Sequence, residues 1–132
     1  MKRFLIACGA VLLACHSPTA PTDSVNKVTG RLSGIVKIGP NCPVEQPGNP
    51  CPTPPSAYLL RKILVYDEQR KNLLHTVDID SQGLYFIELA PAKYLVDLKG
   101  AGIDRTSDLP KVIEIHTNTV TTVNVNIDTG LR

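Results

Sequence analysis

From residue 28 onwards, apolar and polar residues alternate with a period of two, the spacing of a β-strand with one buried face. Seven segments show this alternation, and turn residues separate them. They are residues 28–38, 60–66, 73–79, 84–89, 93–98, 111–115 and 120–127. No stretch shows convincing helical spacing. Seven short strands at regular intervals predict an all-β fold, a seven-stranded antiparallel β-sandwich.

The alternation also predicts which side chains point into the core. They are Ile63, Val65, Tyr85, Ile87, Leu89, Tyr94, Val96, Leu98, Val123, Val125 and Ile127. Gly30 and Gly34 interrupt the first segment, where glycine indicates a bulge or a close approach of two backbones. Gly83 ends the stretch Asp-Ser-Gln-Gly and is expected to supply the positive φ of a tight turn.

The first 27 residues lack this alternation. Lys2 and Arg3 precede an apolar run, Phe4–Ala14, of 11 residues. A membrane-spanning helix needs about 20 apolar residues, so the run is too short to span. A charged start, a short apolar run and small residues at its end predict a secretory signal. Residues 16–27 are rich in Ser, Thr, Pro and Asp, which predicts a flexible tether.

Leu12-Leu13-Ala14-Cys15 resembles the lipobox of bacterial lipoproteins. The resemblance implies cleavage before Cys15 and acylation of that cysteine, which would anchor the chain to a membrane. The expected organisation is a signal peptide at 1–14, a tether at 15–27 and one β-sandwich domain at 28–132. The alternative is an ordinary signal peptide cut near Ala20. His16, in place of Asp after the cysteine, implies the outer rather than the inner membrane if there are two.

Export to an oxidising compartment would decide the chemistry of the cysteines. Cys8 would leave with the signal and Cys15 would carry lipid, so Cys42 and Cys51 remain as a pair. The eight residues between them include three prolines and a glycine, which cannot form a central strand. We predict a Cys42–Cys51 disulfide. A zinc site or a redox pair is the alternative, but the histidines are far apart and no Cys-x-x-Cys occurs.

Net charge argues against a nucleic-acid partner. The formal charge is +2, but removing Lys2 and Arg3 reduces the 14 basic side chains to 12, equal to the 12 acidic ones. A neutral domain has no electrostatic footprint for nucleic acid. The pairs Arg61-Lys62 and Arg70-Lys71 are expected at solvated strand ends and turns.

Residues 76–96 resemble the centre of the carboxypeptidase regulatory-like domain, which is a prealbumin-like (transthyretin-like, Ig-like) β-sandwich. The matching positions are Asp80, Gly83, Tyr85, Leu89, Pro91, Tyr94 and Val96. Ala92 stands where the family pattern has glycine. The resemblance implies the fold and says little about function, because one fold supports many functions.

Candidate chemistry is sparse. No nucleophile elbow, zinc-protease motif or P-loop occurs. The C-terminus lacks the Tyr-Arg-Gly-Ser ending of the hydroxyisourate hydrolases that share this fold. We therefore expect no enzyme activity, no metal and no cofactor. The best place for a binding site is the long connection 100–110, through Asp104, Arg105 and Asp108, since loops on rigid scaffolds carry binding sites. A solvated connection closed by the packing of Leu109-Pro110 is nevertheless the favoured interpretation of this segment.

These observations favour a non-enzymatic, lipid-anchored protein of the bacterial cell envelope. Its β-sandwich would contact another envelope protein or give structural support. The alternative is a carbohydrate-binding module, which would need exposed aromatic rings. Tryptophan is absent, so Tyr58, Tyr66 and Phe86 are the available candidates.

Overall fold

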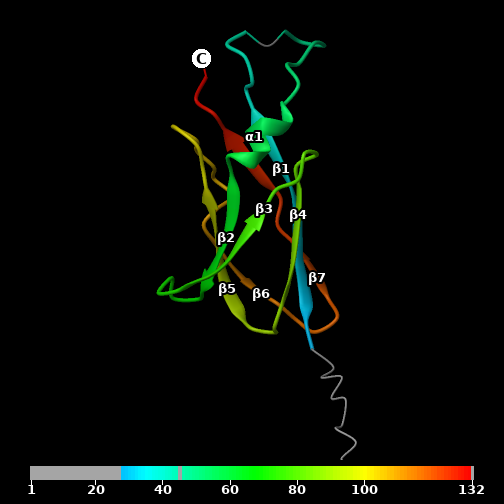
Figure 1. Ribbon diagram of the computed structural model, residues 1–132, viewed down its shortest axis with the longest axis vertical. Coiled ribbons are helices and arrows are strands. Elements are labelled where there is room, and N and C mark those ends of the chain that lie inside the picture. Colours follow the sequence, from blue (N-terminus) through cyan, green and yellow to red (C-terminus); the bar gives the residue numbers. More distant parts are fainter. Residues whose placement is uncertain (1–27, 45, 132) are drawn as a thin grey trace, which may run out of the picture.

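The computed structural model describes residues 28–44 and 46–131. Within them, eight strands and one short helix form two facing sheets (Figure 1). The elements are β1 (Gly30–Gly39), α1 (Pro55–Leu59), β2 (Lys62–Asp67), β3 (Leu73–Asp78), β4 (Leu84–Leu89), β5 (Lys93–Lys99), β6 (Lys111–Glu114), β7 (Val120–Thr122) and β8 (Val125–Asp128). The expected signal peptide, Cys15 and the tether lie outside the described residues and stay predictions.

The predicted all-β sandwich is confirmed, with two differences in detail. One sheet has the order β4-β1-β7, with β8 also paired to β1, and the other has the order β3-β2-β5-β6. Adjacent strands pair antiparallel, except that β1 pairs parallel with β7 and with β8. A parallel pair needs a long crossover. Here the crossover is the whole chain between β1 and β7. The local alternation of apolar and polar residues does not reveal this parallel pairing.

The predicted last strand is divided into β7 and β8 by side-chain hydrogen bonds. The buried Tyr85 hydroxyl donates to the Val123 carbonyl oxygen at 2.5 Å. The main-chain amide of Ile35 donates to a side-chain oxygen, that of Asn124, at 3.0 Å. Thus the ladder beside β1 is interrupted for two residues, although the alternation of buried side chains continues through the break.

The core lies between the two sheets and follows the predicted alternation. Of the eleven side chains expected to point inwards, all are buried except Ile87 and Leu98, which are partly buried and pack against the core. The hydroxyl of Tyr94, like that of Tyr85, has a partner, the Ala90 carbonyl oxygen at 2.7 Å. A core hydroxyl with a partner avoids the cost of desolvation without a hydrogen bond.

The predicted roles of three glycines are confirmed. A Cβ atom built on Gly34 would lie 1.9 Å from the Val123 carbonyl oxygen. One built on Gly30 would lie 2.2 Å from the His116 carbonyl oxygen. Gly83 has a φ of +84° in the turn before β4. The first two allow the close approach of two backbones, and the third allows a left-handed turn.

The sequence shows no convincing helical spacing, and the short helix α1 was not predicted. This helix begins at Pro55, where the missing amide hydrogen is tolerated. Its five residues are too few to show helical periodicity. It buries Tyr58, which contacts the turn at Gly83. Among the described residues, no helix has the length and hydropathy required to cross a membrane.

The start of β1 and the C-terminal segment lie at opposite ends of the sandwich (Figure 1). In this view β1 begins at the lower end, and α1 and the C-terminus lie at the upper end. We call the upper end the loop end; among the described residues it comprises 39–44, 46–61, 100–105 and 128–131. Main-chain hydrogen bonds join its segments, from Thr129 to Gly39 at 3.0 Å and from Arg105 to Asp128 at 2.9 Å.

Candidate functional site

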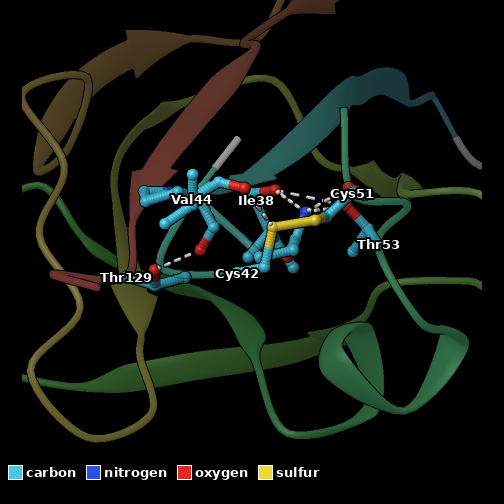
Figure 2. Close-up of a disulfide and its surroundings, with 8 residues drawn as sticks. Ile38, Cys42, Val44, Cys51, Thr53 and Thr129 are labelled. Atoms are coloured by element: carbon cyan, nitrogen blue, oxygen red, sulfur yellow. Dashed lines mark hydrogen bonds between the residues drawn. A yellow bond between two sulfur atoms is a disulfide. The ribbon is translucent and has the colours of Figure 1, made fainter. Parts of the chain in front are cut away.

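The loop end contains a disulfide between Cys42 and Cys51, as the sequence predicted (Figure 2). Their Cα atoms are 6.1 Å apart. The side-chain amide of Asn41 donates to the main-chain carbonyl oxygens of Ile38, at 2.9 Å, and of Cys51, at 3.2 Å. It also reaches the Thr53 hydroxyl at 2.9 Å. Side-chain bonds therefore fix the base of a loop whose prolines cannot donate main-chain hydrogen bonds.

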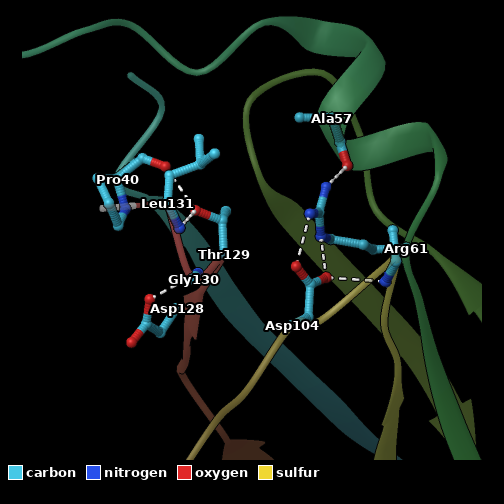
Figure 3. A network of polar contacts seen from close by, with 9 residues as sticks. Pro40, Ala57, Arg61, Asp104, Asp128, Thr129, Gly130 and Leu131 are labelled. Atoms are coloured by element: carbon cyan, nitrogen blue, oxygen red, sulfur yellow. Dashed lines mark hydrogen bonds and ion pairs between the residues drawn. The ribbon is translucent and has the colours of Figure 1, made fainter. Parts of the chain in front are cut away.

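A buried ion pair joins α1 to the long connection (Figure 3). Nε of Arg61 lies 2.6 Å from Oδ2 of Asp104, and its Nη2 lies 2.9 Å from Oδ1. The side chains are only 8% and 3% exposed. Nη1 of Arg61 also donates to the Ala57 carbonyl oxygen at 2.7 Å. The expectation that Arg61 is solvated was therefore wrong, since its guanidinium forms a bidentate pair inside the loop end.

Hydrogen bonding keeps the Asp104 carboxylate ionised. Burial on its own raises the pKa of this group, because it disfavours the charged form. The hydrogen bonds from Arg61 and from the Ala101 amide, together with the charge of Arg61, outweigh burial and lower the pKa of Asp104 below its ordinary value. The Ala101 amide donates at 2.8 Å. The pair is thus charged at neutral pH.

The other two residues of the predicted binding loop support the edge of β8. The main chain of Arg105 pairs with that of Asp128, at 2.9 and 2.8 Å. Oδ2 of Asp108 accepts from the main-chain amide of Asn126 at 2.7 Å and from its side chain at 3.2 Å. These contacts cover an edge strand that would otherwise present unpaired groups. Both aspartates of the loop therefore act within the fold, while the Arg105 side chain is exposed.

A shallow apolar trough lies on the outer face of the β4-β1-β7 sheet. Ser33 faces Phe86 on β4 and Thr122 on β7, and Ile35 faces Leu84. Because paired residues share one face of a sheet, these side chains gather there. Four of the residues that line the trough are apolar and exposed: Ile35 (45%), Leu84 (43%), Phe86 (62%) and Val120 (59%). We call these four the outer apolar face; they surround a hollow of about 460 Å³.

Polar groups border this face at the end nearest the start of β1. The Arg31 guanidinium lies 4.9 Å from the centre of the Phe86 ring, a cation–π contact. It also pairs with Glu88 at 3.2 Å, and both side chains are about half exposed. Local alternation does not reveal this site, because its members come from three strands. The apolar residues at outward positions, Leu84 and Phe86 on β4 and Ile35 on β1, are the signal that could have found it.

The aromatic side chains do not form a common platform for a sugar. Tyr58 is buried, against the expectation that it is available. Tyr66 lies on β2 beneath the guanidinium of Arg70, 5.3 Å from the ring centre, on the sheet opposite to Phe86. Sugar-binding surfaces stack rings of the ligand on exposed aromatic faces. The geometry of the described residues therefore gives no support to a carbohydrate-binding module.

The two histidines of the described segment are exposed and separate. His75 lies on β3 and His116 follows β6. These two strands are the opposite edges of the same sheet. In residues 28–44 and 46–131, no three His, Cys, Asp or Glu side chains are grouped as metal ligands would be.

The sequence matches no family model and no curated protein. Solved structures are similar in fold. The minor pilin GBS52 of Streptococcus agalactiae has a TM-score of 0.51 and 13% identity, over 76% of this chain and 44% of the pilin. DUF3823 family proteins of Parabacteroides merdae and Bacteroides ovatus have TM-scores of 0.45, with 13% and 16% identity over 77% and 74% of this chain.

This chain spans less than half the length of each of these structures, 44%, 47% and 44%. At such low identity the similarity concerns the fold and not the activity. The likeness to the pilin agrees with the two-sheet arrangement and is compatible with an Ig-like or prealbumin-like domain. The chain folds as a β-sandwich.

Proposed function

We propose that this chain is a non-enzymatic, lipid-anchored protein of the bacterial cell envelope whose sandwich contacts another protein or supports surface structure. Acylation at Cys15 would attach it, to the outer membrane where there are two. One observation carries the proposal. The chain enters the sandwich at the start of β1, at the end opposite to the loop end (Figure 1). An anchor on the N-terminal side therefore leaves the loop end free to contact a partner.

The loop end is built as a rigid surface. The disulfide and the Asn41 side-chain amide close the loop between β1 and α1, and the Arg61–Asp104 pair joins segments 43 residues apart in sequence. Preorganised loops lose little conformational entropy on binding, which favours protein contacts. Val44, in the disulfide loop, is 75% exposed, and Leu60 beside α1 is 65% exposed. Exposed apolar side chains on a fixed frame suit a protein partner better than a small molecule.

Motif residues also agree with a carboxypeptidase regulatory-like domain. Gly83 forms its turn with positive φ, and Tyr85 and Tyr94 are buried in the core. Pro91 and Ala92 lie in the connection between β4 and β5, where the family pattern places Pro-Gly. This assignment is part of the proposal, because the fold similarity does not distinguish it from other sandwiches.

The anchor is tested by the intact mass of protein extracted from membranes of the native host. We expect a chain that begins at Cys15 and carries acyl groups, with the Cys42–Cys51 disulfide intact. Cys15→Ser is the matched control, and it should be released from the membrane fraction with no lipid mass. A mature chain that begins after Cys15 and carries no lipid would overturn the anchor.

The interaction is tested by a photo-cross-linking residue placed at Leu60, on the loop end, in living cells. The control position is Thr76, an exposed residue on β3. We expect one defined cross-linked product at Leu60 and none at Thr76. Equal products at both positions, or no product at either, would contradict a partner at the loop end.

A further inference from the structure

The outer apolar face is a second exposed surface, separate from the loop end. A partner at the loop end would not cover it. Ile35, Leu84, Phe86 and Val120 are each more than two-fifths exposed and lie on one side of one sheet. Contiguous exposed apolar side chains on a soluble domain mark an interaction surface. This surface lies along β1, the strand by which the chain enters the sandwich.

We propose that the outer apolar face lies against the lipid surface to which the chain is anchored. The inference rests on the proposed anchor at Cys15. It places the β4-β1-β7 sheet towards the membrane and the β3-β2-β5-β6 sheet towards the surrounding water. The sandwich then lies along the membrane, and the loop end projects sideways from it.

The length of chain outside the sandwich fits this placement. Residues 15–27 number thirteen, so at about 3.3–3.6 Å per residue they span at most roughly 45 Å. β1 has ten residues and is therefore about 33 Å long. The connection to Cys15 is therefore long enough for the domain to lie flat, and it keeps the domain within roughly 45 Å of the surface. Tethering of this kind gives an effective concentration on the order of millimolar, so a weak contact is sufficient.

The chemistry of the face suits the boundary between lipid tails and headgroups. An aromatic ring, three aliphatic side chains and neighbouring cations are the combination that binds such an interface. Arg31 covers the Phe86 ring, and Lys37 extends from the same side of β1 and is exposed. Both cations can approach headgroup phosphates while the apolar side chains enter the acyl boundary. Glu88 is the one acidic side chain among the outward residues of β1, β4 and β7.

The opposite outer face is less suited to lipid. It has an apolar row, in which Tyr66 pairs with Leu95 and Leu95 with Val112. However, Arg70 crosses this row, since its guanidinium stacks on Tyr66 and pairs with Asp97. The same face carries further ionic side chains on all four strands. They are Lys62, Asp78, Lys93, Lys99 and Glu114. Moving these five charged side chains out of water costs more than moving Arg31, Glu88 and Lys37.

The test places a fluorescent label on each outer face of the lipidated full-length protein. Thr122→Cys lies beside the outer apolar face and Thr76→Cys lies on the opposite face; both threonines are exposed and on strands. The protein is reconstituted in phosphatidylethanolamine–phosphatidylglycerol vesicles that contain a headgroup-quencher lipid. We expect quenching at least threefold stronger at position 122 than at position 76. Equal quenching, or stronger quenching at 76, would overturn the inference.

A second pair of variants tests the side chains themselves. Phe86→Ser removes an exposed ring from the outer apolar face, and Val112→Ser removes an exposed side chain from the opposite face. We expect Phe86→Ser to reduce the quenching at position 122 by at least half and Val112→Ser to leave it unchanged. An equal effect of both would contradict the proposal. If Phe86→Ser fails to fold, Val120→Ser replaces it, because that side chain is 59% exposed.

The outcomes separate this inference from the proposed function. If the mature protein carries no lipid, the anchor fails and the inference fails with it. If the lipidated protein stays on the vesicles but neither face is preferentially quenched, the anchor stands and only the orientation is wrong. A label at position 122 that cross-links to a protein in intact cells, without quenching by lipid, would assign the face to a protein partner and overturn the inference.

Discussion

The guanidinium of Arg61 and the carboxylate of Asp104 form a bidentate pair, 43 residues apart in sequence, in which both side chains are almost fully buried. Arg61 follows α1, and Asp104 lies in the connection between β5 and β6. The pair therefore fixes two segments of the loop end to each other. It also fixes the place of α1, because Arg61 binds the Ala57 carbonyl oxygen.

Replacing Asp104 by asparagine should destabilise the domain strongly. The variant leaves the Arg61 guanidinium buried without a counter-charge, and breaking a buried pair in this way costs about 3–5 kcal/mol. The free energy of unfolding measured by urea denaturation checks this expectation. The double variant Arg61→Met/Asp104→Leu should recover part of the loss, since it removes both charges together.

The matched control is Asp78→Asn at the exposed Lys62–Asp78 pair. The Asp78 side chain is 82% exposed. An exposed pair contributes roughly 0–1 kcal/mol, so this variant should change stability little. A loss as large as that of Asp104→Asn would show that burial does not decide the strength of these pairs.

The Arg61–Asp104 ion pair should also make the domain sensitive to acid. The pKa of Asp104 is lowered in the folded state, so its contribution is fully present above the unfolded value of about 3.9. It is lost as the pH falls through the lower folded value. The free energy of unfolding should therefore decrease from about pH 4 downwards. Subtracting the profile of Asp104→Asn from that of the wild type should isolate this slope, and parallel profiles would contradict the assignment.

Removing the disulfide should destabilise the loop end. A bridge that closes a loop of this size contributes roughly 2.5–3 kcal/mol in the chain-entropy model. The double variant Cys42→Ser/Cys51→Ser should lose about that amount in urea denaturation. Dithiothreitol should bring the wild type to the same stability and leave the variant unchanged. An effect of the reductant on the variant would point to a different thiol as its target.

Gly34→Ala, in the middle of β1, should be far more harmful than Gly39→Ala at the C-terminal end of the strand. The new Cβ would lie 1.9 Å from the Val123 carbonyl oxygen, and relieving such overpacking costs about 1–3 kcal/mol or more. At Gly39 an added Cβ meets nothing within 4 Å. Gly39→Ala should therefore be neutral or slightly stabilising. Melting temperatures of the two variants check the difference, and equal losses would contradict the close approach at Gly34.

Much of the sandwich could be predicted because its signals are local. The alternation of Ile63 and Val65, or of Val125 and Ile127, indicates a strand with one buried face whatever its neighbours are. The turn at Gly83 and the Cys42–Cys51 disulfide also depend on residues that are close in the chain.

The candidate sites could not be predicted because their members are distant in sequence. The acids of the 100–110 connection were the candidate ligand-binding residues. Instead Asp104 is neutralised by Arg61 and Asp108 covers the edge of β8. The outer apolar face likewise depends on the register that sets Phe86 beside Ser33.

The amino-acid sequence alone determined the strands, their inward faces, the glycine turn and the cysteine pair, since each follows from the chemistry of neighbouring residues. Only the tertiary structure decided that β1 runs parallel to β7 and β8, that Arg61 is buried and which face remains apolar. Those features depend on which strands lie side by side. Many strand orders satisfy the same alternation, and the packing of the whole core selects one of them.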